Sequence, residues 1–371
     1  MENINNWYFV ANIDNIDTPA LLVYPERIQE NINKAKSKVA GVEWLRPHVK
    51  THKMAEVARL MLDAGITKFK CATVAEAEML GRAGAPDVLL AYQPVGPKIN
   101  RLLQLVQTYR ATTFACLLDN KASADAISQI FAAAGETTGV YLDLNVGMNR
   151  TGIQPGPEAL ELYLMASNLA GVKPVGLHTY DGHLRDADYL LRKEKSDLAF
   201  AAVTALAAKI EAHGLPKPIL IAGGSPTFPV HAQRQGVESS PGTFIFWDWG
   251  YHVLLAEQDF LFAALVATRV ISKLDEHTLC LDLGHKAIAA ENPFPRVKFL
   301  NAPNAEAISQ SEEHLVVHVA SGNYYAVGDV FYGVPLHICP TCALYDWAHV
   351  VENNQATTTW RVVSRTRAIT I

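Results

Sequence analysis

The chain has 371 residues, enough for one large domain and a smaller one. Apolar residues make up 49% and charged residues 19%, and the net charge of -5 leaves no basic surface for nucleic acid. No uninterrupted run of 18 apolar residues occurs, and residues 1–7 lack the basic and apolar parts of a secretory signal. We therefore expect neither a membrane span nor a leader. The 5 cysteines form an odd, sparse set, which predicts reduced thiols and a cytoplasmic location.

Short strand patterns alternate with helical patterns from residue 42 onward. Before them, residues 18–24 form an apolar extended run, and residues 25–38 have helical spacing. The predicted strands are residues 43–47, 68–73, 88–92, 113–118, 140–145, 174–180, 219–223 and 242–246. The predicted helices are residues 54–62, 74–83, 98–109, 122–134, 158–170 and 189–213, with at most a short helix in 225–238.

These strand candidates are continuous apolar runs, which is typical of parallel strands buried on both faces. Eight such units predict a (β/α)8 barrel, and an open doubly wound sheet is the structural alternative. The pattern changes after residue 255, where residues 260–272, 278–282, 314–319, 324–330 and 357–367 read as strands. We therefore predict a barrel over residues 1–255 and a C-terminal β domain over residues 256–371.

A basic cluster in residues 45–53 follows the first predicted strand. It contains Arg46, Lys50 and Lys53, together with His48 and His52. A lysine at a strand end with no nearby carboxylate is an unusual use of a charge. We interpret Lys50 as an amine that forms a Schiff base with a cofactor, and a solvated run of charges is the alternative.

Polar loops follow the ends of several other predicted strands, where barrel enzymes carry their chemistry. The turn that contains Gly223, Gly224, Ser225 and Thr227 exposes backbone N–H groups and hydroxyls, which suit a phosphate. Such a turn can also be only a turn, but Gly242 and Thr243 from the next strand would complete an anion site. Arg150 lies in a loop with few other charges, where it is either a surface residue or a ligand-binding one.

A His-x-Cys pair, His337 and Cys339, occurs near the C-terminus. An imidazole and a thiolate at this spacing can bind one borderline cation and leave positions for water and substrate. Cys339 and Cys342 could instead be a redox pair or two buried thiols. Of the 13 histidines, only His52, His178, His183 and His337 lie in the candidate loops.

The motif of residues 46–53 resembles the lysine motif of D-threonine aldolases and D-serine dehydratases, pyridoxal-phosphate enzymes with an alanine-racemase-like fold. The resemblance extends over nearly the whole chain. It includes residues 18–21, 145–152 and 223–225, the region of Tyr180, and the His337-x-Cys339 pair. It implies a barrel with a C-terminal β domain and a homodimer with shared active sites.

The resemblance also implies individual roles. Lys50 would be the Schiff-base lysine, Tyr180 would pack on the ring of pyridoxal 5'-phosphate, and Arg150 would contact its phenolic oxygen. His337 and Cys339 would bind a divalent metal (zinc, or manganese or magnesium), so that Lys50, Tyr180 and His337 form the catalytic set. The predicted phosphate site consists of Gly223, Gly224, Ser225, Thr227, Gly242 and Thr243.

Together with this site, the resemblance implies a lyase of small β-hydroxy-amino acids, and the D configuration is implied by the resemblance alone. Retro-aldol cleavage would give glycine and an aldehyde, whereas β-elimination would give a keto acid and ammonia. Cys339 favours the dehydratase, while residues 178–183 look more like the bacterial aldolases, and we predict the D-threonine-aldolase-like activity. An amino-acid racemase and a cofactor carrier without turnover are further alternatives.

Overall fold

The computed structural model describes residues 6–320 and 324–371. The chain divides into two compact units, which we call the barrel unit and the sheet unit. The barrel unit consists of Asn33–Lys50, Val57–Gly242 and Thr366–Ile371, and the sheet unit of Met1–Ile32, Thr51–Glu56 and Thr243–Arg365. Within the described ranges, no helix is both long enough and apolar enough to cross a membrane.

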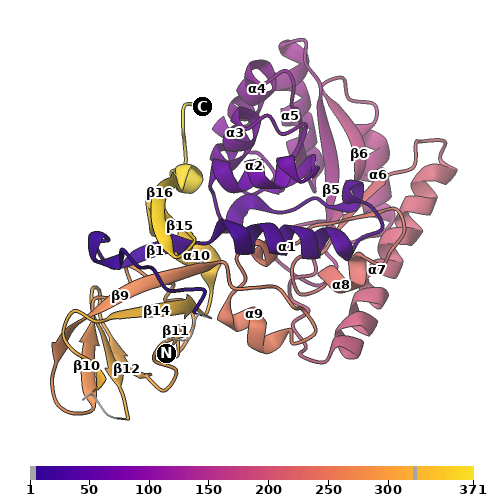
Figure 1. The fold of residues 1–371 in the computed structure, drawn as a ribbon. Coiled ribbons are helices and arrows are strands. Elements are labelled where there is room, and N and C mark those ends of the chain that lie inside the picture. Colours follow the sequence, from indigo (N-terminus) through magenta and orange to yellow (C-terminus); the bar gives the residue numbers. More distant parts are fainter. Residues whose placement is uncertain (1–5, 321–323) are drawn as a thin grey trace. The chain divides into compact units, whose positions relative to one another are not determined.

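The barrel unit contains seven parallel strands that pair in chain order, β2 with β3 and so on to β8. The strands are β2 (Lys68–Cys71), β3 (Asp87–Leu90), β4 (Thr113–Leu118), β5 (Thr138–Leu144), β6 (Val172–Thr179), β7 (Ile219–Ala222) and β8 (Val237–Ser239). Helices alternate with them along the chain (Figure 1). These helices are α2 (Ala55–Asp63), α3 (Val74–Arg82), α4 (Pro97–Thr108), α5 (Lys121–Ala133), α6 (Pro157–Ala166), α7 (Tyr189–Ala212) and α8 (Phe228–His231).

The segment from Leu45 to His48 occupies the eighth position and joins the two edge strands. Leu45 forms a parallel bridge with Ser239 of β8, and His48 forms one with Lys70 of β2. Backbone hydrogen bonds of 2.9 Å from Arg46 N to Ser239 O and 2.8 Å from Lys70 N to Pro47 O continue the pairing. The strands therefore close into a ring, which confirms the predicted barrel and excludes the open sheet.

Apolar side chains from several strands form a core cluster in the barrel unit, namely Leu89, Ala115, Leu117, Tyr141 and Ile221. Continuous apolar strands are required because one face packs on this cluster and the other on helices.

A buried ion-pair network includes Arg46, the first base of the sequence motif. Its guanidinium contacts Asp87 at 2.6 Å and Glu238 at 2.6 Å, and Lys68 pairs with the same Glu238. Burial opposes the charge of Arg46, but the hydrogen bond and charge of Asp87 and the charge of Glu238 raise its pKa overall. Arg46 is therefore a structural cation, and the alternative of a solvated charge run is wrong for this residue.

Two of the predicted barrel strands differ in the structure. Residues 42–44 form a 3-10 helix (Val42–Trp44), and only the following segment pairs with strands. Residues 242–246 form another 3-10 helix (Thr243–Ile245), with Trp247 N donating to Thr243 O at 2.7 Å. A short buried apolar run does not distinguish a strand from a helical turn. The true last strand, β8, is only three residues long and contains the charged Glu238, which hid it from a hydrophobic pattern.

The sheet unit is built around a nine-stranded sheet, in which neighbours follow the order β12-β13-β10-β9-β1-β15-β16 and β14 joins β9 to β11. The strands are β1 (Ala20–Val23), β9 (Ala264–Lys273), β10 (Thr278–Leu281), β11 (Val297–Phe299), β12 (Glu306–Gln310), β13 (Leu315–His318), β14 (Val330–Pro335), β15 (Trp347–Glu352) and β16 (Gln355–Arg361). This strand-rich C-terminal part agrees with the predicted fold class. The helices assigned outside the barrel series are α1 (Pro25–Ser37), α9 (Trp249–Leu254) and α10 (Ile338–Cys342).

Strand β1 comes from the beginning of the chain but pairs with strands of the C-terminal half. It is antiparallel to β9 and parallel to β15, and the indigo arrow lies beside orange and yellow strands in Figure 1. The sequence analysis predicted the extended run of residues 18–24 but not its partners. The predicted domain boundary after residue 255 stays a prediction.

The predicted strand over residues 324–330 is wrong. Gly328 has a φ of 100°, and the Asp329 side chain accepts a hydrogen bond of 2.8 Å from Ala326 N, which closes a turn. The strand begins only at Val330, and it leads through Pro335 directly to His337.

Candidate active site

Lys50 lies in a 3-10 helix (Val49–Thr51) immediately after the segment that closes the barrel. Its side chain is half-buried, and its Nζ lies 5.6 Å from the centroid of the Tyr180 ring. His48 holds the turn, because its Nδ1 accepts a hydrogen bond of 3.2 Å from Lys50 N. The sequence motif thus places an amine beside an aromatic ring at the carboxyl end of the barrel strands.

Tyr180 follows β6, and two glycines allow its close packing. A Cβ on Gly224 would lie 2.8 Å from Tyr180 Cε2, and a Cβ on Gly182 would lie 2.1 Å from the phenolic oxygen. Arg150 approaches the same ring, with its Cζ 5.0 Å from the centroid. The structure therefore brings together Lys50, Tyr180 and Arg150, which the sequence analysis assigned to one cofactor.

Buried polar residues form a series of contacts beside the same ring. The sequence analysis did not predict these contacts. Lys70 of β2 has its Nζ 5.9 Å from the Tyr180 centroid and 3.4 Å from His178 Nε2. His178 Nδ1 lies 2.7 Å from Asp143 Oδ1, and Thr151 donates to the other carboxylate oxygen at 2.7 Å. These residues come from three strands and one loop, so no local pattern reveals their contact.

The charges of this chain affect one another. Burial, followed by the positive charge of Lys50, lowers the pKa of Lys70 to about 7. Burial and then the charge of Lys70 also lower the pKa of His178, although Asp143 opposes the shift. For Asp143 itself, burial favours protonation, but the hydrogen bond and charge of His178 lower its pKa overall.

The predicted phosphate turn is held by a buried carboxylate. Asp181 Oδ1 accepts a hydrogen bond from Thr227 Oγ1 at 2.6 Å, while Asp181 Oδ2 accepts from Ser196 Oγ at 3.2 Å and lies 2.8 Å from His231 Nε2. Burial would raise the pKa of Asp181, but the charge and hydrogen bond of His231 and these hydroxyls lower it. Since a threonine side chain has one O–H donor, the Thr227 hydroxyl has no proton left to donate to a phosphate.

The other predicted phosphate residues in the barrel unit lie at the ends of β7 and β8. Gly223 has a φ of 77° and donates its N–H to Thr179 O at 2.9 Å. Gly242 N donates to Ser225 Oγ at 3.3 Å, which brings the two strand ends together. Thr243 belongs to the sheet unit instead, where its hydroxyl lies 3.6 Å from Cys339 Sγ.

Two buried serine hydroxyls mark the same region as suitable for an anion. Ser239 Oγ and Ser240 Oγ are buried and have no hydrogen-bond partner among the described residues. A buried hydroxyl without a partner loses free energy, on the order of 1–3 kcal/mol. These hydroxyls lie at the end of β8, and β8 pairs with β7, which leads into the Gly223–Gly224 turn. Their position suits donation to the oxygens of a phosphate.

The candidate metal ligands lie together in the sheet unit. His337 precedes α10, and a side-chain hydrogen bond joins it to Cys339. Thr51 Oγ1 lies 3.2 Å from Cys339 Sγ. Burial alone would raise the pKa of the Cys339 thiol, but the hydrogen bond and charge of His337 lower it. Burial would lower the pKa of His337, yet Cys339 and Glu291 raise it to about 9.

The donor set of His337 and Cys339 fits a borderline divalent cation such as zinc, for which imidazole and thiolate are usual ligands. No cluster of three or more histidine, cysteine or acidic side chains suited to a metal occurs in residues 6–320 and 324–371. The pair therefore supplies two ligands at most. Asp248 fixes the segment, because its carboxylate accepts from Ile338 N at 3.2 Å and from Tyr251 N at 2.9 Å.

The remaining histidines of the candidate loops have other positions. His52 is buried in the sheet unit, where burial lowers its pKa to about 3 and its Nδ1 accepts from Met54 N. His183 packs against the backbone of Gly147, where a Cβ would come within 2.6 Å of its Nε2.

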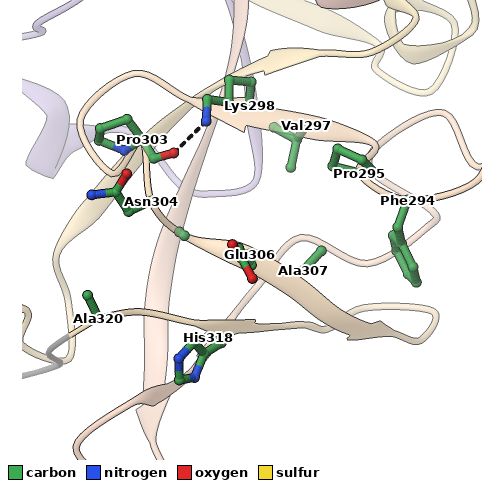
Figure 2. Close-up of a pocket in the computed structure, with 11 residues that line it drawn as sticks. Phe294, Pro295, Val297, Lys298, Pro303, Asn304, Glu306, Ala307, His318 and Ala320 are labelled. Atoms are coloured by element: carbon green, nitrogen blue, oxygen red, sulfur yellow. Dashed lines mark hydrogen bonds between the residues drawn. The ribbon is translucent and has the colours of Figure 1, made fainter.

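A cavity of about 830 Å³ lies in the sheet unit, between residues of β11, β12 and β13 (Figure 2). Its 11 lining residues include Lys298, Glu306 and His318 but none of the predicted site residues. This cavity and the reactive groups of the candidate site therefore lie in different places. We assign the site by chemistry, because the strand-end residues and the His337–Cys339 pair combine reactive groups with partners that shift their pKa values.

Known proteins are similar to this chain over both units. Residues 23–248 match the family "Alanine racemase, N-terminal domain", and residues 263–351 match "Putative serine dehydratase domain". The 3-hydroxy-D-aspartate aldolase of Paracoccus denitrificans is 29% identical over 94% of this chain and 92% of its own. The D-threo-3-hydroxyaspartate dehydratase of a Delftia species is 28% identical over 76% of this chain and 75% of its own.

The solved structure of D-threonine aldolase from Filomicrobium marinum has the same fold. The two align with a TM-score of 0.87 at 26% identity, over 94% of this chain and 95% of the other. Pyridoxal phosphate is the cofactor that this family implies. The chain therefore belongs to the alanine-racemase-like family of D-threonine aldolases and D-serine dehydratases, as its lysine motif predicted.

Proposed function

We propose that the protein is a lyase of β-hydroxy-D-amino acids that uses pyridoxal phosphate and a divalent metal, with D-threonine-aldolase-like activity. The observation that carries the proposal is the convergence of Lys50, Arg150 and Lys70 on the ring of one aromatic residue, Tyr180. Cations in such numbers around one ring suit a cofactor that bears a phosphate and a phenolic oxygen.

In this proposal the barrel unit holds the cofactor. Lys50 Nζ is the attachment point, Tyr180 packs on the ring and Arg150 holds the phenolic oxygen. Gly223, Gly224, Ser225 and Gly242 form the phosphate site, to which we add the hydroxyls of Ser239 and Ser240. When bound, pyridoxal phosphate would supply an electron sink for the bonds at the substrate's Cα.

Lys50 and Lys70 are the ionisable nitrogens available for proton transfer beside the Tyr180 ring. The released amine of Lys50 is a suitable base or acid, because its Nζ stands at the ring that orients the cofactor. Lys70, with a pKa of about 7, keeps a second ionisable nitrogen at this ring. The His178–Asp143 pair holds Lys70 in place through the contact between Lys70 Nζ and His178 Nε2.

In the sheet unit, His337 and Cys339 would hold the metal, and we propose zinc, with manganese or magnesium as the alternatives. A cation there would lower the pKa of a hydroxyl bound to it and stabilise the charge that develops on the oxygen. His337 lowers the pKa of Cys339 and so favours its thiolate form, which is the form that binds a metal.

A dehydratase is the second candidate, and Cys339 is the observation that favours it. The dehydratase of Delftia is one of the relatives of this chain, so the fold accommodates either reaction in the family. The test is the product pattern from D-threonine and from 3-hydroxy-D-aspartate. Glycine plus an aldehyde supports the aldolase, whereas a keto acid plus ammonia overturns it in favour of the dehydratase.

We also propose that the protein forms a homodimer with shared active sites and is located in the cytoplasm. The described cysteines are all free, in agreement with a reducing compartment. Light scattering after size-exclusion chromatography measures the oligomeric state, and a monomeric mass for the active enzyme would contradict the shared sites.

A further inference from the structure

The imidazole of His337 has a carboxylate partner that comes from a distant loop. Its Nδ1 lies 2.5 Å from Glu291 Oε1, although the two residues are 46 positions apart. An ionised carboxylate only accepts hydrogen bonds, so the proton of this contact belongs to Nδ1. In the neutral imidazole, Nε2 is then left with a lone pair, as a metal ligand requires.

The loop that carries Glu291 is fastened to the segment that carries His337. The buried Thr341 hydroxyl accepts from Ala289 N at 3.1 Å and donates to His337 O at 2.8 Å. A single side chain thus links the backbone next to Glu291 with the backbone of His337 itself. The relative placement of the carboxylate and the imidazole is therefore built into the backbone.

Further contacts hold the same loop on both sides of Glu291. Tyr345 Oη donates to Ala287 O at 2.6 Å, and Arg296 Nε donates to Asn292 O at 2.8 Å. Glu291 Oε1 also accepts from Asn292 Nδ2 at 3.1 Å, so the carboxylate has a second restraint. These contacts all lie within the sheet unit.

The contact is too exposed to serve mainly for stability. The side chains of His337 and Glu291 are 41% and 47% exposed, and ion pairs at such exposure contribute little to folding. Orientation of the ring is a role that such a pair can still perform, because the second nitrogen of a metal-bound histidine commonly donates to a carboxylate.

We propose that Glu291 is a positioning residue for the divalent metal site, which holds His337 through Nδ1 and directs Nε2 to the cation. The inference rests on the proposed function, since it takes His337 and Cys339 as metal ligands. Glu291 acts through His337 and needs no contact with the metal, the cofactor or the substrate.

The test is a titration of the metal-free full-length protein with Co²⁺, followed by the charge-transfer absorbance of the thiolate–cobalt bond. Glu291→Ala should weaken Co²⁺ binding by about 10- to 100-fold, the range found for lost outer partners of metal ligands. Glu291→Gln keeps an oxygen that accepts a hydrogen bond from His337 Nδ1–H. Its loss of Co²⁺ affinity should therefore be several-fold smaller than that of Glu291→Ala. The shape of the cobalt spectrum should be the same in all three proteins, because the direct ligands are unchanged.

A matched control is Glu276→Ala, which removes an exposed glutamate from the β9–β10 turn of the same unit. It should leave cobalt affinity within about two-fold of the unaltered protein. Circular dichroism of each variant shows whether the fold is retained.

Two results would overturn the inference. Unchanged cobalt affinity in Glu291→Ala would show that the carboxylate does not position the ring. A changed spectrum, with affinity lowered as far as in His337→Ala, would show that Glu291 is itself a ligand. Failure of the proposed function is distinguishable, because His337→Ala and Cys339→Ala would then leave cobalt binding intact as well.

Discussion

The strand-end cluster of the barrel unit and the His337–Cys339 cluster of the sheet unit are assembled in different ways. The first joins Lys50, Lys70, Asp143 and His178, which are far apart in sequence. The second has two neighbouring residues at its centre, so its chemistry is visible in a short motif. A motif can therefore reveal reactive groups, whereas the groups that tune them are found only in the fold.

Burial separates the two clusters as well. Lys70 and His178 are almost fully buried, so that charge repulsion and desolvation change their protonation strongly. His337 and Glu291 are about half exposed, and their contact depends on the loop that Thr341 holds. We expect substitutions in the barrel cluster to change pH dependence and those in the sheet cluster to change metal binding.

The largest effect is expected from Lys50→Ala, which breaks the barrel cluster at the proposed attachment point. Activity should fall by about 10³-fold or more, since the variant lacks the amine that we propose to attach the cofactor beside the Tyr180 ring. The visible absorbance of the bound cofactor should disappear, while circular dichroism stays unchanged.

Lys53→Ala is the matched control within the same motif. Lys53 has a φ of 57°, and its carbonyl accepts hydrogen bonds from Ser364. The substitution should leave the visible absorbance in place. Loss of that absorbance in Lys53→Ala, with retention in Lys50→Ala, would contradict the choice of lysine.

The next effect in size is expected in the sheet cluster, from Cys339→Ala. We expect activity to fall by about 10²-fold, because a bound cation stabilises transition-state charge by several kcal/mol. Metal content, measured by plasma mass spectrometry, should fall in parallel, and the visible absorbance should remain. Chelation should reproduce the loss in the unaltered protein, so full activity after complete removal of metal would contradict the metal role.

The sequence predicted most of the fold, because the barrel strands and helices have strong hydrophobic patterns. Strand β4 was predicted with its observed bounds, Thr113–Leu118. The hydrophobic pattern did not predict β8, where the buried Glu238 forms ion pairs with Arg46 and Lys68. Hydrophobicity cannot indicate a buried charge whose partners lie about 170 to 190 residues earlier in the sequence.

The candidate site could be predicted as residues but not as contacts. Lys50 and the His337–Cys339 pair came from motifs, Arg150 came from its position in a loop with few other charges, and Tyr180 came from resemblance to a family. Lys70, Asp143 and Glu291 were missed, because each is an ordinary charged residue until the fold gives it a histidine partner.

Lys70→Met tests whether burial in the barrel cluster shifts a protonation equilibrium. The variant should change the pH dependence of the free energy of unfolding. The folded pKa of Lys70 is about 7, whereas an unfolded lysine has a pKa of about 10.4. Between these values the unfolded chain binds a proton that the folded chain lacks, so the free energy of unfolding rises with pH. From pH 7 to pH 9, the unaltered protein should gain about 2 kcal/mol relative to the variant.

The measurement is urea unfolding of the cofactor-free protein at several pH values. The groups that face Lys70 are Lys50, Arg46, Asp143, Asp181 and His178, and they are common to both proteins. Lys173→Met, at an exposed position of β6, should leave the slope unchanged. Equal slopes in the unaltered protein and Lys70→Met would mean that Lys70 keeps an ordinary pKa in the folded state.

The smallest effect on cofactor binding is expected from Thr227→Val, which tests whether this residue binds the phosphate or supports the site. Its hydroxyl donates to the buried Asp181 at 2.6 Å, so the variant should lose about 1.5–3 kcal/mol of unfolding free energy. Pyridoxal phosphate affinity should change by about three-fold or less, because the hydroxyl proton is not available to the phosphate. Thr227→Ser should retain the stability, and Thr204→Val on the exposed face of α7 serves as control. A ten-fold loss of cofactor affinity with unchanged stability would instead return Thr227 to the phosphate site, as the sequence predicted.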